Sequence, residues 1–310
     1  MFFRLRDAAH RIRFSLATRN ILSTPPLALE PGPAEVLSLV RHADVPMYLL
    51  AIKSFYRRLG RGAVSVLADV DLGPEDRALI RRHVPGVRFS EIRDVPLGGC
   101  QSGGCWERLL HVADRTDDTY VIQLDSDVLT FGDISEILAC VAQNRSFALG
   151  ADGARVVPLL TAAEETPAYR HVINDACRAF TRMPGAEGLR YLVHGSAGLS
   201  GFARQGTPRA RVEQFHHTMM GLLGDTWREW GSEQVASNFA VANAPEAMAL
   251  PWPKYANHIP GQPVEAAECL HFFGTYRFHG GLFLKRAVAE IAAMEGRAAP
   301  APRHRASATA

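Results

Sequence analysis

The sequence has few cysteines and none of the patterns that cysteines form in disulfide-rich or zinc-binding proteins. There are five in 310 residues, at positions 100, 105, 140, 177 and 269, and no Cys-x-x-Cys pair occurs. An odd number at irregular spacing, in a chain long enough for a large core, argues against a disulfide framework and predicts a reducing compartment. A zinc site at Cys100 and Cys105 would lack a second Cys/His pair at ligand spacing.

Long apolar runs and an excess of one charge are also absent. No run approaches the roughly 18 apolar residues of a transmembrane helix. Residues 1–20 lack the apolar centre of a secretory signal peptide, so we expect a cytoplasmic protein. Lys plus Arg is 34 and Asp plus Glu is 32, which leaves a net charge of +2. A nucleic-acid-binding protein usually has a clear basic excess, so we expect no nucleic-acid partner.

The charge that is present is unevenly placed. Residues 1–20 carry five Arg and one Asp, and residues 297–310 carry three Arg and no acid, so the remaining body is mildly acidic. Solvated chain ends are one interpretation of this pattern. The alternative is a peripheral contact of the basic N-terminal segment with the anionic inner face of a membrane. The tail 297–310 consists mainly of Ala, Pro and Arg and is predicted to be disordered.

The rest of the chain reads as one α/β domain. Four Pro at 25, 26, 31 and 33 predict a linker, so residues 1–33 are expected to be a basic segment followed by this linker. Residues 34–296 are expected to form the domain. We expect its nucleotide-binding half at 34–152 and its acceptor-side half at 153–296. Apolar strands alternate with helical patterns, which predicts βαβ units and a mostly parallel central sheet flanked by helices on both faces. The predicted strands are 36–40, 63–68, 87–92, 119–124, 147–150 and 269–273. The predicted helices are 46–59, 73–83, 106–113, 134–143, 169–180, 212–223, 233–242 and 282–294. Two short apolar stretches are expected within 192–202, and a loop over 251–263.

The stretch 119–131 carries the strongest chemical signal. An apolar strand delivers Asp125 and Asp127 at its carboxyl end, where ligands bind in open α/β sheets. Residues i and i+2 of an extended chain point the same way, so the two carboxylates can hold one hard cation with room for phosphate oxygens. A second Asp-x-Asp pair, at 69–71, also follows a strand, but the Leu-Gly-Pro-Glu after it favours a turn or a helix cap.

Three further side chains are candidates for the same site. His271 would complete a set of two Asp and one His, which suits Mn²⁺ or a similar ion. Arg108, on the helix before the strand, and Arg277, six residues after His271, have guanidinium groups that grip phosphate through two parallel hydrogen bonds. Taken singly, each residue has a plainer interpretation, as a surface arginine or a core histidine.

Together these residues resemble the A-type glycosyltransferases, most closely glycosyltransferase family 8, the glycogenin and lipopolysaccharide galactosyltransferase group. That family has an Arg-Leu pair ahead of Asp-x-Asp-x-Leu; here Arg108-Leu109 lies 17 residues before Asp125, and Leu129 completes the motif. The family's C-terminal signature, His-Phe-x-Gly-x-x-Lys-Pro-Trp, is similar to residues 271–279, where Arg277 takes the place of Lys and Pro-Trp is missing. The resemblance spans about residues 34–285.

The resemblance implies the remaining site residues. Asp152 looks like the Asp on the next strand that contacts the donor sugar. Ser196-Ala197-Gly198 stands where Asn-Ala-Gly is usual, and Glu233-Gln234 stands where Asp-Gln is usual. The implied metal ligands are Asp125, Asp127 and His271. The implied catalytic residues are Glu233, Gln234 and Asp152, and the implied donor-binding residues are Arg108, Asp125, Asp127, Ser196, Ala197, Gly198, Gly274 and Arg277. Whether Glu233 or Gln234 acts as a nucleophile stays open.

What the resemblance implies is a Rossmann-like nucleotide-diphospho-sugar transferase fold and a retaining sugar transfer. The donor would be a nucleotide sugar of the UDP type, the cofactor Mn²⁺ or Mg²⁺, and the acceptor a saccharide or a lipid-linked glycan. A cation on the two Asp and the His would stabilise the charge that develops on the leaving diphosphate, and the two Arg would add fixed positive charge. The sugar would become oxocarbenium-like.

Two other functions stay open at this stage. A sugar-1-phosphate nucleotidyltransferase shares a related sheet, but it usually has a Gly-rich loop and a catalytic Lys after the first strand, where this chain has Arg41, His42, Ala43 and Asp44. A degenerate glycosyltransferase fold that only binds a nucleotide sugar or a protein is the second alternative, because Ser196 and the missing Pro-Trp depart from the family pattern. The sequence carries no signal for an oligomeric state.

Two nearby features are weaker predictors. Arg41, His42 and Asp69, at strand ends, are candidate contacts for the nucleotide base. Trp227 and Trp230, three residues apart, are expected to pack in the core, and the alternative is an aromatic platform for an acceptor sugar.

Overall fold

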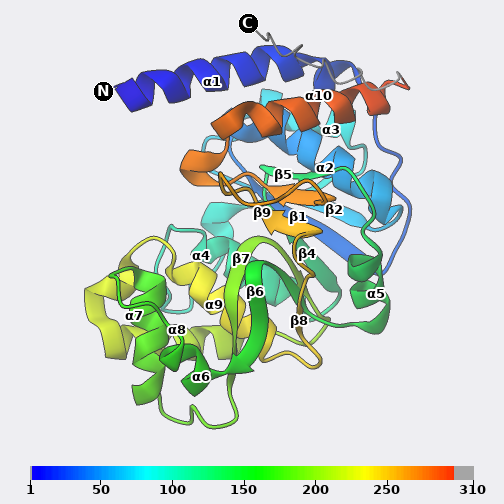
Figure 1. Ribbon diagram of the computed structural model, residues 1–310. Coiled ribbons are helices and arrows are strands. Elements are labelled where there is room, and N and C mark those ends of the chain that lie inside the picture. Colours follow the sequence, from blue (N-terminus) through cyan, green and yellow to red (C-terminus); the bar gives the residue numbers. More distant parts are fainter. Residues whose placement is uncertain (1, 297–310) are drawn as a thin grey trace, which may run out of the picture.

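A seven-stranded sheet forms the centre of the structure, a computed structural model that describes residues 2–296 (Figure 1). The strand order is β3-β2-β1-β4-β7-β6-β8. The predicted tail 297–310 lies outside the described residues. The strands of this sheet are β1 (Ala34–Val40), β2 (Ala63–Ala68), β3 (Arg88–Glu91), β4 (Tyr120–Leu124), β6 (Phe147–Pro158), β7 (Arg190–Phe202) and β8 (Met248–Ala249).

The sheet is mostly parallel, as the alternating pattern predicted. β3, β2, β1 and β4 are parallel neighbours, and β8 is parallel to β6. β7 runs antiparallel to both β4 and β6. The carboxyl ends of β1, β2 and β4 therefore meet at one edge of the sheet, which is where such sheets bind ligands.

Helices cover both faces of the sheet, so the predicted α/β class with flanking helices is confirmed. Successive strand residues point to opposite faces, and accordingly Val36 lies in one hydrophobic core and Leu37 in the other. Residues of α2, α3, α5 and α10 contribute to the first core, and residues of α4, α7, α8 and α9 to the second. The helices are α1 (Phe2–Thr18), α2 (Val45–Leu59), α3 (Pro74–His83), α4 (Trp106–Arg115), α5 (Ser135–Gln143), α6 (Leu159–Glu164), α7 (Val172–Ala179), α8 (Arg209–Leu223), α9 (Ser232–Ala242) and α10 (Leu282–Met294).

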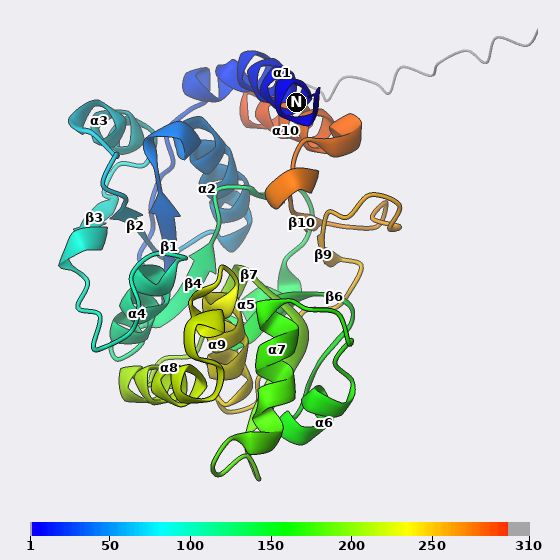
Figure 2. The ribbon, with the colours of Figure 1, turned by 90° about the vertical axis from the view of Figure 1, so that its left-hand side faces the viewer.

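The basic N-terminal segment forms α1, which lies along α10 in both ribbon views (Figures 1 and 2). Phe14 on α1 packs against the rings of Phe278 and Phe283, with ring centroids 5.3 and 4.4 Å apart. Among the described residues, no helix combines the length and the apolar character needed to cross a bilayer.

A second, three-stranded sheet has the order β5-β10-β9, with β5 (Val128–Thr130), β9 (Tyr255–Asn257) and β10 (Cys269–His271). β10 pairs antiparallel with β5 and parallel with β9. Only residues 125–127 separate the end of β4 from the start of β5, so this small sheet extends from the carboxyl edge of the large one. It brings a C-terminal strand next to the loop that carries the Asp-x-Asp motif.

Most predicted elements occur within a few residues of their predicted bounds, but three regions differ. The stretch 192–202, predicted as two short apolar pieces, belongs to one continuous strand of 13 residues, β7. The short strand predicted at 147–150 continues to Pro158 as β6, with an irregular register between Gly150 and Arg155. The predicted loop 251–263 contains β9. The second Asp-x-Asp pair, at 69–71, forms a turn before α3, as expected.

A buried Lys–His contact joins the linker to the first core. The Lys53 ammonium donates to Thr24 Oγ1 at 2.7 Å, to the Pro25 carbonyl at 2.8 Å and to His83 Nδ1 at 3.0 Å. Burial and then the Lys53 charge lower the pKa of His83 to about 4, so the imidazole is a neutral acceptor at pH 7. This arrangement anchors the segment before β1 to α2 and α3.

Acid should weaken this anchor. The folded-state pKa of His83, about 4, is below its ordinary value of 6.5, so its contribution to stability is complete above pH 6.5 and is lost as the pH falls toward 4. His83→Gln keeps an acceptor for Lys53 but cannot titrate. Over this pH interval we expect the unfolding free energy of the variant, measured by urea denaturation, to fall by about 1–2 kcal/mol less than that of the wild type. An unaltered slope in His83→Gln would contradict the assignment.

Candidate active site

The Asp-x-Asp motif forms a tight turn at the carboxyl end of β4. The backbone N–H of Asp125 donates to the Gly198 carbonyl on β7 at 2.9 Å, and the N–H of Val128 donates to the Asp125 carbonyl at 3.1 Å. The first bond continues the β4–β7 ladder, and the second closes the turn that leads into β5. Both bonds fix the backbone around the two carboxylates.

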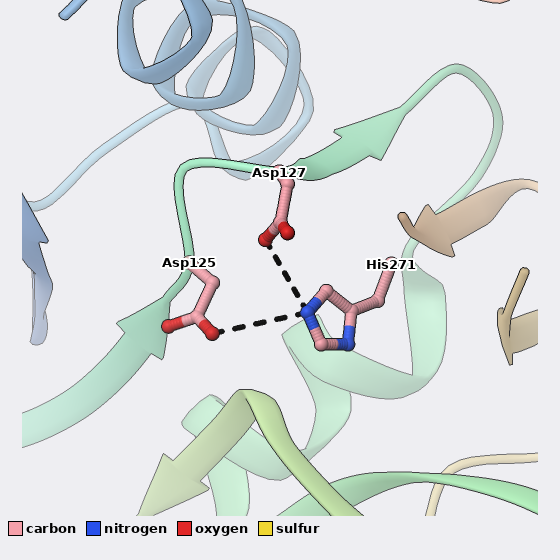
Figure 3. A group of neighbouring side chains, drawn as sticks. All are labelled: Asp125, Asp127 and His271. Atoms are coloured by element: carbon pink, nitrogen blue, oxygen red, sulfur yellow. Dashed lines mark ion pairs between the residues drawn. The ribbon is translucent and has the colours of Figure 1, made fainter. Parts of the chain in front are cut away.

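His271 reaches the same turn through the small sheet. The register pairs His271 on β10 with Val128 on β5, and the N–H of Phe272 donates to the Asp127 carbonyl at 2.9 Å. The Nε2 atom of His271 lies 3.3 Å from Asp127 Oδ1 and 3.8 Å from Asp125 Oδ2 (Figure 3). Among residues 2–296 this is the one group of three or more His, Cys, Asp or Glu side chains whose ligand atoms all lie close together, within 4.8 Å of one another.

The ring of His271 is oriented by Asn257, its neighbour on β9. His271 Nδ1 lies 2.9 Å from Asn257 Oδ1, and the Asn257–His271 pairing follows from the β9–β10 register. Since an amide oxygen only accepts, Nδ1 carries a proton; the two carboxylates outweigh burial and raise the pKa of His271, so Nε2 also carries a proton toward Asp127 unless a cation replaces it. Histidines that bind metals usually donate their second N–H to such a partner. Ser196 Oγ lies 3.3 Å from the same Nδ1.

Gly198 makes room for the histidine ring. A Cβ at this position would lie 2.4 Å from two atoms of the His271 ring, well below any contact that real Cβ atoms make. Gly198 also accepts the Asp125 backbone bond described above. The backbone of the Ser-Ala-Gly stretch therefore holds the Asp125 turn, and the missing side chain at Gly198 leaves space for the His271 ring.

Two arginines divide the oxygens of the carboxylates. Arg277 donates to Asp127 Oδ2 at 2.7 Å, and Arg108 donates to Asp125 Oδ1. The other oxygen of each carboxylate faces His271 Nε2. The result is a trio of Asp125 Oδ2, Asp127 Oδ1 and His271 Nε2, flanked by two guanidinium groups. Arg108 also contacts Glu233 Oε1 at 3.3 Å, which links α9 to the site.

Burial and charge act on the pKa values in opposite directions. Burial raises the pKa of Asp125 above its usual range. Burial acts in the same sense on Asp127, but the charges of His271 and Arg277 outweigh it and lower the pKa of that carboxyl. Burial raises the pKa of Glu233 to about 7, against the pull of Arg108. The site thus concentrates three acids and compensates them with fixed cations.

A cleft of about 520 Å³ opens in front of this cluster. Its wall includes Arg108, Asp125, Asp127 and Arg277, and further along it Arg41 and Asp69. Trp227 is fully buried among aromatic rings, as predicted for a core residue, but the same prediction for Trp230 is wrong, since Trp230 is 74% exposed and lines the cleft.

The other predicted site residues are placed as follows. Gln234 follows Glu233 on α9 and donates to the Gly195 carbonyl at 3.3 Å. Ala197 is buried on β7, and its carbonyl accepts from the Gln123 amide. Gly274, with φ of 52°, opens the short helical turn before Arg277. Asp152 lies exposed in the irregular part of β6, and no hydrogen bond or ion pair joins it to the cluster within the described chain.

Two residues of the site had no sequence prediction. Asn257 lay in a predicted loop, and nothing in the local sequence marks it as a partner of His271. Glu107 precedes Arg108 on α4 and lines the cleft. Its Oε1 accepts from the Gly103 N–H at 2.8 Å, while its Oε2 is buried without a partner among the described residues. An unpartnered buried carboxylate oxygen is costly, which indicates that Glu107 is available to a ligand.

The likeness to known proteins is one of structure. No family model matches this sequence, and no curated protein matches it either. The chain is similar to the galactosyltransferase LgtC, crystallised with donor and acceptor sugar analogs, at 12% identity and a TM-score of 0.47, over 84% of this chain and 95% of that one. An active-site mutant of LgtC matches over the same shares at 13% identity with a TM-score of 0.46. Mouse xyloside xylosyltransferase 1, apo form, has 12% identity and a TM-score of 0.39, over 79% of this chain and 98% of that one. At such low identity and TM-scores, function has to be argued from the site itself.

Gly198 provides a test of the cluster geometry. In Gly198→Ala the added methyl would displace the His271 ring, so we expect Mn²⁺ affinity, measured by calorimetric titration, to fall by about 10-fold or more. Gly221→Ala is the matched control, because a Cβ there has no neighbour within 4 Å, and it should bind Mn²⁺ as the wild type does. Equal affinity in both variants would show that His271 is not a ligand.

Proposed function

We propose that the protein is a metal-dependent, retaining hexosyltransferase. It would move a sugar from a nucleotide-sugar donor of the UDP type to a saccharide or lipid-linked acceptor. The observation that carries the proposal is the convergence of Asp125 and Asp127, from one turn, with His271, from a segment far along the chain, at a cleft flanked by Arg108 and Arg277.

The donor set fits a divalent cation. Two carboxylate oxygens and one imidazole nitrogen suit Mn²⁺, with Mg²⁺ as the alternative for an oxygen-rich site. The Asn257 contact supports this fit, because it leaves Nε2 as the atom that a cation would bind in place of a proton. When bound, the cation would act as a Lewis acid for the diphosphate of the donor.

The arginines would stabilise the leaving group. Arg277 is half-buried beside Asp127, and its guanidinium has further N–H groups for phosphate oxygens. Arg108 is 4% exposed and held by Asp125 and Glu233, so its charge is fixed in place before a donor arrives. Fixed charges of this kind need no reorganisation as negative charge develops. The nucleotide would extend along the cleft toward Arg41 and Asp69.

Glu233 and Gln234 would lie beside the transferred sugar. The bond from the anomeric carbon to the β-phosphate oxygen breaks, and its electron pair goes to the phosphate. A new bond forms to the hydroxyl oxygen of the acceptor, whose proton passes to the departing phosphate oxygen. Glu233, held beside Arg108 with a pKa of about 7, would stabilise an oxocarbenium-like sugar electrostatically in its ionised form, which is about half populated at pH 7. Retention is supported by the family resemblance, as are the sugar-contacting roles of Asp152, Ser196, Ala197, Gly198 and Gly274.

We also propose a cytoplasmic location, peripheral to the inner face of the membrane. The five cysteines are free thiols, which fits a reducing compartment. On α1, Ile12 and Leu16 lie one helical turn apart and are 61% and 62% exposed, with Arg13 and Arg19 exposed nearby. Exposed apolar residues beside basic ones are typical of helices that lie on anionic lipid.

The proposed reaction has a direct test. The purified protein should slowly hydrolyse at least one UDP-sugar of a panel and release UDP. This release should occur only when Mn²⁺ or Mg²⁺ is present. Asp127→Asn should lower UDP release by about 100-fold, because the variant removes a ligand charge from the centre that stabilises the leaving group. Asp225→Asn is the control, because the Asp225 side chain is fully exposed and is not part of the cleft wall, and it should retain wild-type release. Donor binding without turnover of any UDP-sugar would refute the enzyme and favour a binding protein.

The membrane contact is tested separately by vesicle sedimentation. The protein should sediment with phosphatidylserine-containing vesicles more than with phosphatidylcholine vesicles, and added salt should weaken the binding. Ile12→Asp should weaken it by about 5-fold or more, since it places a charge on the apolar stripe. Val70→Asp, at another highly exposed apolar residue, should bind as the wild type does. Equal binding to both vesicle types would contradict the proposal.

A further inference from the structure

A second cavity, separate from the metal cleft, lies beside α9. Its volume is about 280 Å³, and its walls come from β6, β7, α7, α9 and the segment before α7. Figure 2 shows α7 and α9 side by side over β6 and β7. We call it the second cavity; the residues that matter for its chemistry are Tyr169, His171, Tyr191, Gly195, Gln234 and Asn238.

The second cavity and the metal site share two wall segments. On β7, Gly195 lines the second cavity, while the next residue, Ser196, contacts the ring of His271. On α9, Gln234 lines the second cavity, while the residue before it, Glu233, pairs with Arg108. The second cavity therefore lies next to residues that contact the metal cluster and its arginine.

Buried polar atoms in the second cavity are poorly partnered. Tyr191 and Asn238 are each only 2% exposed; the Tyr191 hydroxyl lies beside the side chains of Asn238 and Cys177, but neither it nor Asn238 Oδ1 makes a hydrogen bond of good geometry with the described residues. The amide nitrogen of Asn238 is engaged, since it donates to the Gly195 carbonyl at 3.1 Å. Leaving such groups unsatisfied costs about 1–3 kcal/mol each, so they indicate a place where a ligand with hydroxyl groups completes the bonding.

The remaining lining has little charge, and an aromatic ring lies at its edge. Tyr169 is 66% exposed. No Lys or Arg occurs among the described residues that line the cavity, and the one acid, Glu165, pairs with Arg155. A phosphate or a nucleotide would find no cation here, whereas a neutral saccharide would find amide and hydroxyl partners and an aromatic face.

We propose that the second cavity binds a neutral saccharide unit of the acceptor. The inference rests on the proposed function, because it assigns the donor to the metal cleft and the acceptor to the second cavity, which Gln234 lines. The acceptor hydroxyl would then approach the transferred sugar past Gln234. Tyr191 and Asn238 would fix the saccharide, and Tyr169 would stack on its face.

Two variants test the assignment, and a third serves as a control. Tyr191→Phe removes only the poorly partnered hydroxyl, and Tyr169→Ala removes the exposed ring without touching the core. Tyr48→Phe is the matched control, because Tyr48 is also fully buried with an unpartnered hydroxyl but lies in the other core. The probes are methyl glucoside, methyl galactoside, lactose and maltose, followed by saturation-transfer NMR, which needs no donor.

At least one probe should bind the wild type and Tyr48→Phe equally. Its affinity should fall about 5-fold in Tyr191→Phe and about 10-fold in Tyr169→Ala, which corresponds to the loss of one hydrogen bond or one stacking contact. Metal-dependent hydrolysis of the UDP-sugar, which needs no acceptor, should stay at the wild-type rate in all three variants.

Three outcomes would overturn the inference. One is that no probe binds the wild type. Another is that Tyr191→Phe and Tyr169→Ala bind the probe as tightly as Tyr48→Phe does. The third is that these two variants raise the KM for the donor, which would assign the cavity to the donor sugar. If the wild type binds a probe but does not hydrolyse any UDP-sugar, the proposed reaction is refuted, whereas the saccharide site is still supported.

Discussion

The site depends on which partner each oxygen of two neighbouring carboxylates faces. Asp125 and Asp127 each give one oxygen to an arginine and leave the other facing His271 Nε2. Two buried acids this close repel each other, and burial alone would favour their neutral forms. The guanidinium groups of Arg108 and Arg277 offset both effects without occupying the oxygens that a cation would need. The same arginines are then the nearest fixed charges to any diphosphate on that cation.

The strand order brings these side chains together. β4 ends in the Asp-x-Asp turn, and the chain continues directly into β5, which pairs with β10 and so brings His271 from the far end of the domain. β9 adds Asn257 on the other side of β10. The small sheet thus provides a candidate metal ligand and the residue that orients it. On α9, Glu233 pairs with Arg108, and the next residue, Gln234, lines the second cavity.

The sequence identified residues better than it identified strands. Asp125, Asp127 and His271 could be assigned because a strand-end Asp pair and a distant His-Phe-x-Gly signature are specific patterns. β7 was predicted as fragments because its glycines lower the expectation of a strand. Those glycines have packing reasons: a Cβ at Gly198 would overlap His271, and one at Gly201 would lie 2.3 Å from Phe147 and Tyr120 side-chain atoms. Asn257 and the second cavity were not predicted, because both arise from strand register and helix packing between segments far apart in the chain.

The central claim is that one divalent cation binds between these three side chains and holds the diphosphate of a nucleotide. The most direct measurement is a crystal structure with Mn²⁺ and UDP, in which anomalous scattering locates the metal. The account predicts a single strong peak bonded to Asp125 Oδ2, Asp127 Oδ1 and His271 Nε2, with diphosphate oxygens completing the coordination. A well-ordered UDP in the cleft without a peak at these atoms, or with the metal bound elsewhere, would contradict it.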